Sequence, residues 1–229
     1  MFWSSSKNIN HFRRRGYPFL VWLTIGVMLV SPLSDAHPRA GAILAVINLL
    51  SILLGAGFAG NRKIVRYAAI PLSFLWMAAR LQEEFGKGLF LYDHSAHFIG
   101  LALTCTILWA ILNHMADVSQ VTNSVIAEAA IGYLVVAITF AQLYWILNEL
   151  VADAFTRQVR PSESAIFLYL SMTSLTGLGN GAILPVNPFV RVLVAFESMT
   201  GIFFVAVVVA RLVSSYRARP RGENPGETP

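Results

Sequence analysis

Six long apolar segments restrict what this chain can fold into. They cover residues 17–33, 40–59, 64–82, 90–113, 123–148 and 188–213. Each is about as long as a helix must be to cross roughly 30 Å of hydrocarbon. Because 56% of the residues are hydrophobic and only 13% are charged, the chain has too few polar residues to cover a soluble domain. We therefore expect an all-α integral membrane protein with six transmembrane helices.

The last two segments are separated by residues 150–187, which contain an apolar run that is too short to cross. This run, residues 162–174, follows Pro161, and we expect a re-entrant helix there. Directly behind it, glycines alternate with larger residues from Leu178 to Gly181. Glycine reaches positive φ at little cost, so successive carbonyls can point to one side. A row of such carbonyls can replace the water around an ion.

A longer pattern surrounds these glycines. It consists of Tyr169–Gly181, Ile183–Pro185, Arg191, Glu197, Gly201 and Ala210–Val213. This pattern resembles the pore module of tetrameric potassium channels. The resemblance extends loosely back to Asn123, whereas the first half of the chain matches only in its number of spans.

The resemblance implies a homotetramer in which residues 116–213 form a pore domain. Its parts are a fifth helix, a pore helix at 162–174, a filter at 176–181 and a sixth helix at 188–213. The filter would bind K⁺ or Na⁺ through Thr176, Gly177, Leu178, Gly179, Asn180 and Gly181. The family pattern keeps the glycines at 179 and 181, but it has Thr, Val, Tyr and Asp where this chain has Gly177, Leu178, Asn180 and Ala182. We expect a less braced filter with weakened potassium selectivity.

The same resemblance suggests roles for residues around the filter. The pore helix would support it through Thr173 and through Tyr169, which we expect to hydrogen-bond Asn180. In the sixth helix, Gly201 lies where the family has a hinge glycine, although a packing role explains it equally well. We expect Glu197, an ionisable residue in a span, to have a partner on the pore helix or the fifth helix. Phe204, with Phe203 and Val207, would form an apolar constriction.

The fourth segment contains no lysine or arginine between Phe90 and Leu112. Residues 17–115 therefore occupy the position of a voltage sensor but lack its arginines, and strong voltage gating by this segment is not expected. Its outer end carries Asp93, His94 and His97, which fall on one face of a helix and would suit a metal or proton site. The competing interpretation is a group of interfacial polar residues that pair with one another or with Arg80.

Eleven of the 17 lysines and arginines fall on one side when both termini are placed in the cytoplasm. This distribution predicts a multi-pass protein of the plasma membrane, or of the inner membrane in a bacterium, with lipid as a partner. Residues 1–16 would be an interfacial N-terminus and residues 214–229 a disordered tail. We expect no nucleic acid, no cofactor and no enzymatic activity. A non-conducting regulatory subunit and a metal-binding membrane protein remain alternatives to a channel.

Overall fold

The computed structural model describes residues 24–26, 46–47, 49–50, 65–85, 95–117, 123–160, 163, 165–179 and 181–217. Its elements are the π-helical turn η1 (Val65–Ala69), α3 (Ile70–Phe85), α4 (Ser95–Asp117), α5 (Asn123–Leu150), α6 (Ala165–Leu175) and α7 (Pro188–Arg217). The described part of the chain is therefore all-α, as expected.

Three of these helices are long and apolar enough to cross a membrane. The candidate spans are Ser95–Ala116 in α4, Val125–Leu150 in α5 and Pro188–Arg211 in α7, and they coincide with the fourth, fifth and sixth predicted segments. The third predicted segment is helical over η1 and α3. The predicted segments 17–33 and 40–59 lie almost entirely outside the described residues, as does the predicted N-terminal stretch 1–16.

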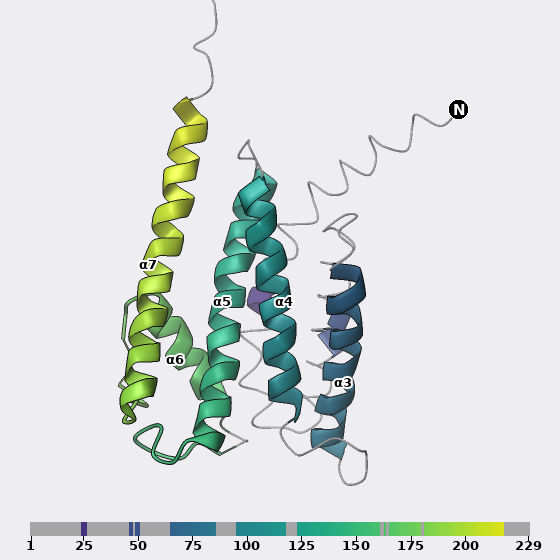
Figure 1. Ribbon diagram of the computed structural model, residues 1–229, viewed down its shortest axis with the longest axis vertical. Coiled ribbons are helices and arrows are strands. Elements are labelled where there is room, and N and C mark those ends of the chain that lie inside the picture. The colour runs from purple at the N-terminus through teal and green to yellow at the C-terminus, as the bar shows by residue number, and fades with distance from the viewer. Residues whose placement is uncertain are drawn as a thin grey trace, which may run out of the picture.

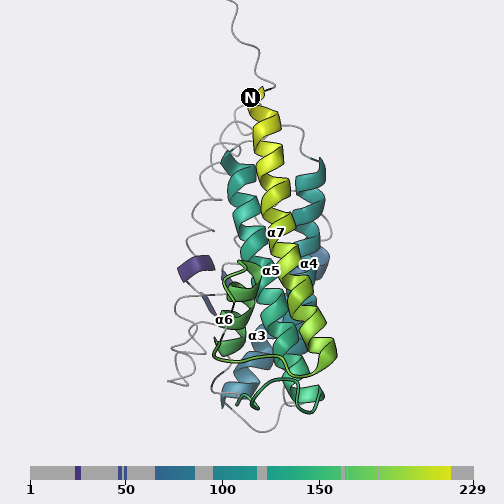
Figure 2. The same cartoon turned by 90° about the vertical axis from the view of Figure 1, so that its left-hand side faces the viewer.

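The four longer helices run side by side, and α6 fits against α5 and α7 in one half of the bundle (Figure 1). Figure 2 shows from the side that α6 covers only part of the length of α7. Its 11 residues rise about 16 Å, too little to cross a bilayer. The predicted re-entrant helix is thus present as a short apolar helix between two candidate spans.

Local chemistry sets the ends of α7. Its first turn is capped by Asn187, whose Oδ1 accepts the backbone N–H of Phe189 at 2.9 Å. Pro188 follows at the first helical position, where its missing N–H costs nothing. The helix continues to Arg217, four residues beyond the end predicted for the sixth helix at 213. Residues 214–217 contain neither glycine nor proline to stop it.

The two ends of the re-entrant segment are tied together beside the C-terminal end of α5. Thr156 donates its N–H to the Leu184 carbonyl at 2.8 Å, and Val186 donates to Ala154 at 2.9 Å. Asn148 at the end of α5 holds Val159 through both amide atoms, each at 3.1 Å. The loop that leaves α5 and the chain that enters α7 therefore form one closed structure.

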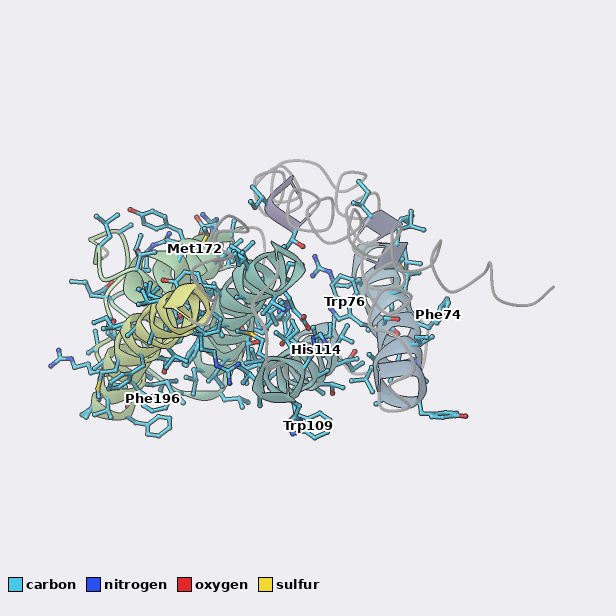
Figure 3. The ribbon with its side chains drawn as sticks, turned by 90° about the horizontal axis from the view of Figure 1, so that it is seen from above. Phe74, Trp76, Trp109, His114, Met172 and Phe196 are labelled. Carbon is cyan, nitrogen blue, oxygen red and sulfur yellow. The ribbon has the colours of Figure 1, made fainter. Side chains whose placement is uncertain are left out.

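The largest buried cluster lies where α5, α6, this loop and α7 meet. Tyr144, Phe155, Phe167, Ile183 and Val190 belong to it. Apolar side chains elsewhere on the bundle point away from it: Phe196 on α7 and Trp109 on α4 project outward, as the view from above shows (Figure 3). The tightest packing thus surrounds the short helix that carries the glycine-rich loop.

Candidate functional site

The loop after α6 begins with a left-handed glycine. Gly177 has φ 74° and donates its N–H to the Ser174 carbonyl at 3.0 Å. A residue of this conformation commonly ends a helix, because it turns the chain back over the last carbonyls. Threonine, the residue of the family pattern at this position, would be strained there. Gly177 is therefore the C-terminal cap of α6 as well as the first glycine of the loop.

A second left-handed glycine follows two residues later. Gly179 has φ 81° and donates to the Thr173 carbonyl at 3.1 Å, so the loop folds back onto α6. Leu178 lies between the two glycines with 80% of its surface exposed. Of the two glycines in the predicted alternation, Gly179 has positive φ and Gly181 does not, while Gly177, just before the predicted stretch, also has positive φ. Asn180 lies outside the described residues.

The two threonines near the loop are engaged with the helix below them. Thr173 is buried, and its hydroxyl donates to the Tyr169 carbonyl at 2.8 Å. Thr176 donates its hydroxyl to the Met172 carbonyl at 2.8 Å. Tyr169 itself is half exposed. Its predicted hydrogen bond to Asn180 stays a prediction because Asn180 is not described.

Glu197 is fully buried and joins three helices. Its Oε2 accepts the Tyr144 hydroxyl of α5 at 2.5 Å, and its Oε1 contacts the Ser171 hydroxyl of α6. Ser171 also lies 2.7 Å from the Ala137 carbonyl of α5. The expected partner on the pore helix or the fifth helix is therefore present on both. This arrangement fixes α6 against the two candidate spans beside it.

Gly201 allows α7 to approach the end of α6. A Cβ added at Gly201 would lie 1.9 Å from the Leu175 carbonyl oxygen, which is too close for any side chain. The same carbonyl accepts the hydroxyl of Tyr133 from α5 at 3.1 Å. The C-terminal end of α6 is thus clamped between α5 and α7. This contact supports the packing interpretation of Gly201.

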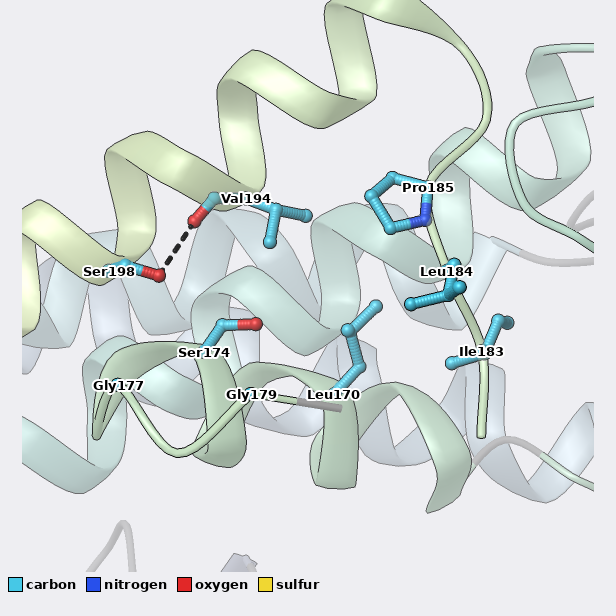
Figure 4. A pocket seen from close by; sticks show the side chains of 9 residues that line it. All are labelled: Leu170, Ser174, Gly177, Gly179, Ile183, Leu184, Pro185, Val194 and Ser198. Carbon is cyan, nitrogen blue, oxygen red and sulfur yellow. Dashed lines mark hydrogen bonds between the residues drawn. The ribbon is translucent and has the colours of Figure 1, made fainter. Parts of the chain in front are cut away.

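A small pocket of about 180 Å³ lies behind the glycine loop, between α6, the chain that enters α7, and α7 itself (Figure 4). Leu170, Ile183 and Val194 give it apolar walls. Ser174 and Ser198 add hydroxyls, and Ser198 donates to the Val194 carbonyl at 3.1 Å. In the single chain, the loop is therefore backed by open space on this side.

The proposed constriction residues do not share a face. Phe204 packs against α5: its ring lies 5.5 Å from the ring of Tyr133, and a Cβ on Gly132 would touch it at 3.5 Å. Phe203 and Val207 are 62% and 56% exposed. They lie four residues apart, which places them on one side of the helix. Phe204 thus supports α7 from behind, whereas Phe203 and Val207 face away from the rest of the chain.

The candidate metal or proton site is only partly described. His97 lies with its Nδ1 2.8 Å from Gln142 Oε1, and its ring stacks on Trp145 at 3.7 Å and 7°. Asp93 and His94 lie outside the described residues, so their relation to His97 stays a prediction. Within the part of the chain that the structure describes, no three His, Cys, Asp or Glu side chains come together.

The loop ahead of α6 carries opposite charges close to each other. The guanidinium of Arg157 contacts a Glu163 carboxyl oxygen at 2.8 Å, and Arg160 contacts the other at 3.5 Å. The hydrogen bond from Arg157 holds the pKa of the Glu163 carboxyl below its usual range. A permanent negative charge therefore sits at the entry to the short helix, with two cations beside it.

Sequence reasoning missed three residues that fix α6: Tyr133, Tyr144 and Ser171. Each carries a hydroxyl inside an apolar segment, and that was the available signal, since buried hydroxyls need partners. Their partners could not be read from the pattern, because they lie 42 residues from Tyr133 and 53 residues from Tyr144 along the chain. Only the packing of three helices brings these groups together.

No curated protein and no solved structure matches this chain significantly. Residues 132–218, however, match a protein-family model described as ion channel. The matched residues include most of α5, the whole of α6, the glycine loop and all of α7. The two candidate spans, the short apolar helix between them and its left-handed glycines are thus the parts that the family describes. Residues 132–218 of this multi-pass membrane protein are therefore similar to an ion channel family over the part that contains α6 and the glycine loop.

Proposed function

We propose that the chain is one subunit of a homotetrameric cation channel that passes K⁺ and Na⁺ with a weakened preference for K⁺. Four copies place their glycine loops around one axis, and the carbonyls of residues 176–180 line the path. Both termini lie in the cytoplasm, and the loop enters from the outer side. Because α4 has no arginines over its apolar length, its contribution to voltage gating is small.

The observation that carries the proposal is the end of α6, with Gly177 and Gly179 both left-handed and Leu178 exposed between them. Irregular backbone at membrane depth is tolerated only where protein covers it or where it lines a water-filled cavity. In one chain this loop is exposed, so further copies are needed to surround it. The C-terminal end of α6 carries the negative end of the helix dipole, which favours a nearby cation.

Two features favour weak discrimination between K⁺ and Na⁺. Gly177 offers no hydroxyl where the family pattern has threonine, which removes one kind of ligand. The pocket behind the loop leaves the backbone unsupported on that side. A loop that can adjust its carbonyls accommodates ions of different size, so the selectivity based on cavity size and on carbonyl field is reduced.

The test is the reversal potential of the purified protein in a bilayer with K⁺ on one side and Na⁺ on the other. We expect a current with a potential near zero. Gly177→Thr supplies the missing hydroxyl but also places a side chain at positive φ. Gly177→Ala is the matched control, because it brings similar backbone strain without the hydroxyl.

A shift toward the potassium equilibrium potential in Gly177→Thr, absent in Gly177→Ala, supports the missing hydroxyl as a cause of weak selectivity. Strong potassium selectivity in the unmodified protein contradicts the loosened loop. No current from the protein alone, with a change in the current of a complete channel when the two are mixed, would instead support a regulatory subunit.

A further inference from the structure

Four oxygen-bearing groups form a chain across α5, α6 and α7. The Tyr144 hydroxyl contacts Glu197, Glu197 contacts the Ser171 hydroxyl, and Ser171 contacts the Ala137 carbonyl. Tyr144, Ser171 and Glu197 are each 0% exposed. Bulk solvent therefore does not contact these side chains, and the described groups hydrogen-bond to one another. Their hydrogen bonds must be satisfied from the protons that the groups themselves carry.

The number of available protons determines whether the carboxyl group of Glu197 is ionised or neutral. The chain contains three contacts between oxygens, and each needs one proton between its two atoms to be attractive. Tyr144 and Ser171 supply one proton each, and the Ala137 carbonyl supplies none. With an ionised carboxylate, two protons would have to serve three contacts. One contact would then join two oxygens with no hydrogen between them.

A neutral carboxylic acid resolves the shortage. Tyr144 donates to Glu197 Oε2, the protonated Oε1 of Glu197 donates to Ser171 Oγ, and Ser171 donates to the Ala137 carbonyl. Each contact then has one donor and one acceptor. The environment favours the same state, because the groups that touch the carboxyl are uncharged hydroxyls. An ionised carboxylate buried without a cation is very costly.

We infer that Glu197 is a protonated acid which positions α6 by donating a hydrogen bond to Ser171. Glu197 acts on the glycine loop only through α6, because it contacts Ser171, four residues before the end of this helix. A neutral acid adds no negative charge beside the ion path. This inference concerns the same pore domain and rests on the proposed function only for its electrical consequences. Its chemical content can be tested in protein that carries no current.

The discriminating variant is Glu197→Gln in the full chain in lipid nanodiscs. A glutamine has the shape of the neutral acid: its oxygen accepts from Tyr144, and its amide donates to Ser171. We expect the folded fraction and the K⁺/Na⁺ permeability ratio to stay within about twofold of those of the unmodified protein. Glu197→Ala removes both contacts and should lower the folded fraction at least about tenfold.

Infrared spectroscopy gives a readout that a merely structural role would not move. The carbonyl band of a protonated carboxylic acid should be present in the unmodified protein at neutral pH and lost in Glu197→Gln. Labelling glutamate with ¹³C should shift this band to lower frequency. Both results support a neutral Glu197, whether or not the protein conducts.

The opposite results are equally clear. If Glu197 is ionised, the band is missing, and Glu197→Gln destabilises the protein as Glu197→Ala does, because its amide hydrogens cannot replace carboxylate acceptors. Either of these findings overturns the inference. A folded protein with the acid band but no current would leave the inference standing and would refute only the proposed function.

Discussion

The two halves of α7 differ in how they are held. From Pro188 to Gly201, the helix buries Val190, Glu197 and Gly201 against α5, α6 and the loop that leaves α5. From Ile202 to Val213, no described side chain is buried. Phe204 and Arg211 provide its attachments, one to α5 and one to α4. Figure 1 shows this second half extending beyond the level that α6 reaches.

This difference separates two tasks that a pore domain has to perform. If the glycine loop is the proposed filter, it needs a fixed support, and the first half of α7 provides one through close packing and buried hydrogen bonds; we call it the fixed half. Opening and closing need a segment that moves at low cost, and few buried contacts are typical of such segments. Under the proposed channel function, we therefore expect the second half of α7, with Phe203 and Val207 exposed, to be the part that moves, and we call it the moving half.

The largest effect is expected where the fixed half is tightest. Gly201→Ala places a methyl group 1.9 Å from the Leu175 carbonyl oxygen, so the backbone of α7 or α6 must shift. We expect a loss of at least about 3 kcal/mol in the free energy of unfolding. Denaturant unfolding of the purified protein in detergent measures it.

Gly181→Ala is the control, because a Cβ there meets no atom within 4 Å and its φ is not positive. It should change the unfolding free energy by less than about 0.5 kcal/mol. Equal effects of the two variants would mean that α7 tolerates a looser contact with α6, and the contrast between the two halves of α7 would fail.

Arg211→Gln tests the attachment of the moving half. The guanidinium of Arg211 donates to the Met115 carbonyl in the last turn of α4. Without this bond, hydrogen exchange in residues 205–213 should speed up about tenfold, while residues 188–200 keep their protection. Exchange measured by mass spectrometry in nanodiscs gives both rates at once.

The matched control is Arg191→Gln in the fixed half. Arg191 also donates to a backbone carbonyl, that of Pro185, at 3.0 Å. Its loss should leave exchange in residues 205–213 unchanged. If both variants speed exchange along the whole helix, α7 opens as one unit and its two halves are not separate in stability.

Tyr133→Phe examines the boundary between the halves. The hydroxyl of Tyr133 donates to the Leu175 carbonyl, while its ring supports Phe204. The variant keeps the ring and removes the hydrogen bond, so we expect a loss of about 1 kcal/mol in unfolding free energy. A loss as large as that of Gly201→Ala would show that hydrogen bonding, and not packing, holds the end of α6.

The smallest effect belongs to the exposed loop. Arg157→Gln should raise the pKa of Glu163 toward its ordinary value. ¹³C NMR of the labelled carboxyl group measures this pKa. Because the pKa of Glu163 is lowered in the folded protein, the contribution of this pair is fully present above the ordinary glutamate pKa. It is lost as the pH falls through the lowered value.

Arg160→Gln is the comparison for this loop, since its contact with Glu163 is longer, 3.5 Å against 2.8 Å. It should shift the carboxyl less than Arg157→Gln. Neither substitution should change the unfolding free energy measurably, because all three side chains are partly or largely exposed.

Hydrophobic length was enough to predict α4, α5 and α7, and the start of α7 at Pro188 was correct to the residue. The short α6 was predicted three residues early at its start and one residue early at its end. The contacts of Gly201 and Glu197 could not be derived in the same way. They depend on how closely separate helices approach, and apolar patterns contain no information on that distance.

The role of Gly177 shows a further limit. Alternating glycines predicted a row of left-handed residues, and the structure has them at Gly177 and Gly179. Aligning the chain to the family pattern placed the two glycines of the filter at 179 and 181. The positive φ of Gly177 has a local cause instead, because a helix that stops at Leu175 is capped by the next available glycine.

The pairing of residues 154–156 with 184–186 has a consequence for engineering. Because its two ends are bonded to each other, this stretch enters and leaves the helix bundle at one place. Residues 154–186 can therefore be exchanged as a unit only if the new segment also keeps the contacts of Ser171 and Leu175 with α5 and α7. Foreign sequence joined inside this pairing, between Thr156 and Leu184, would instead lack the backbone hydrogen bonds that hold the two ends together.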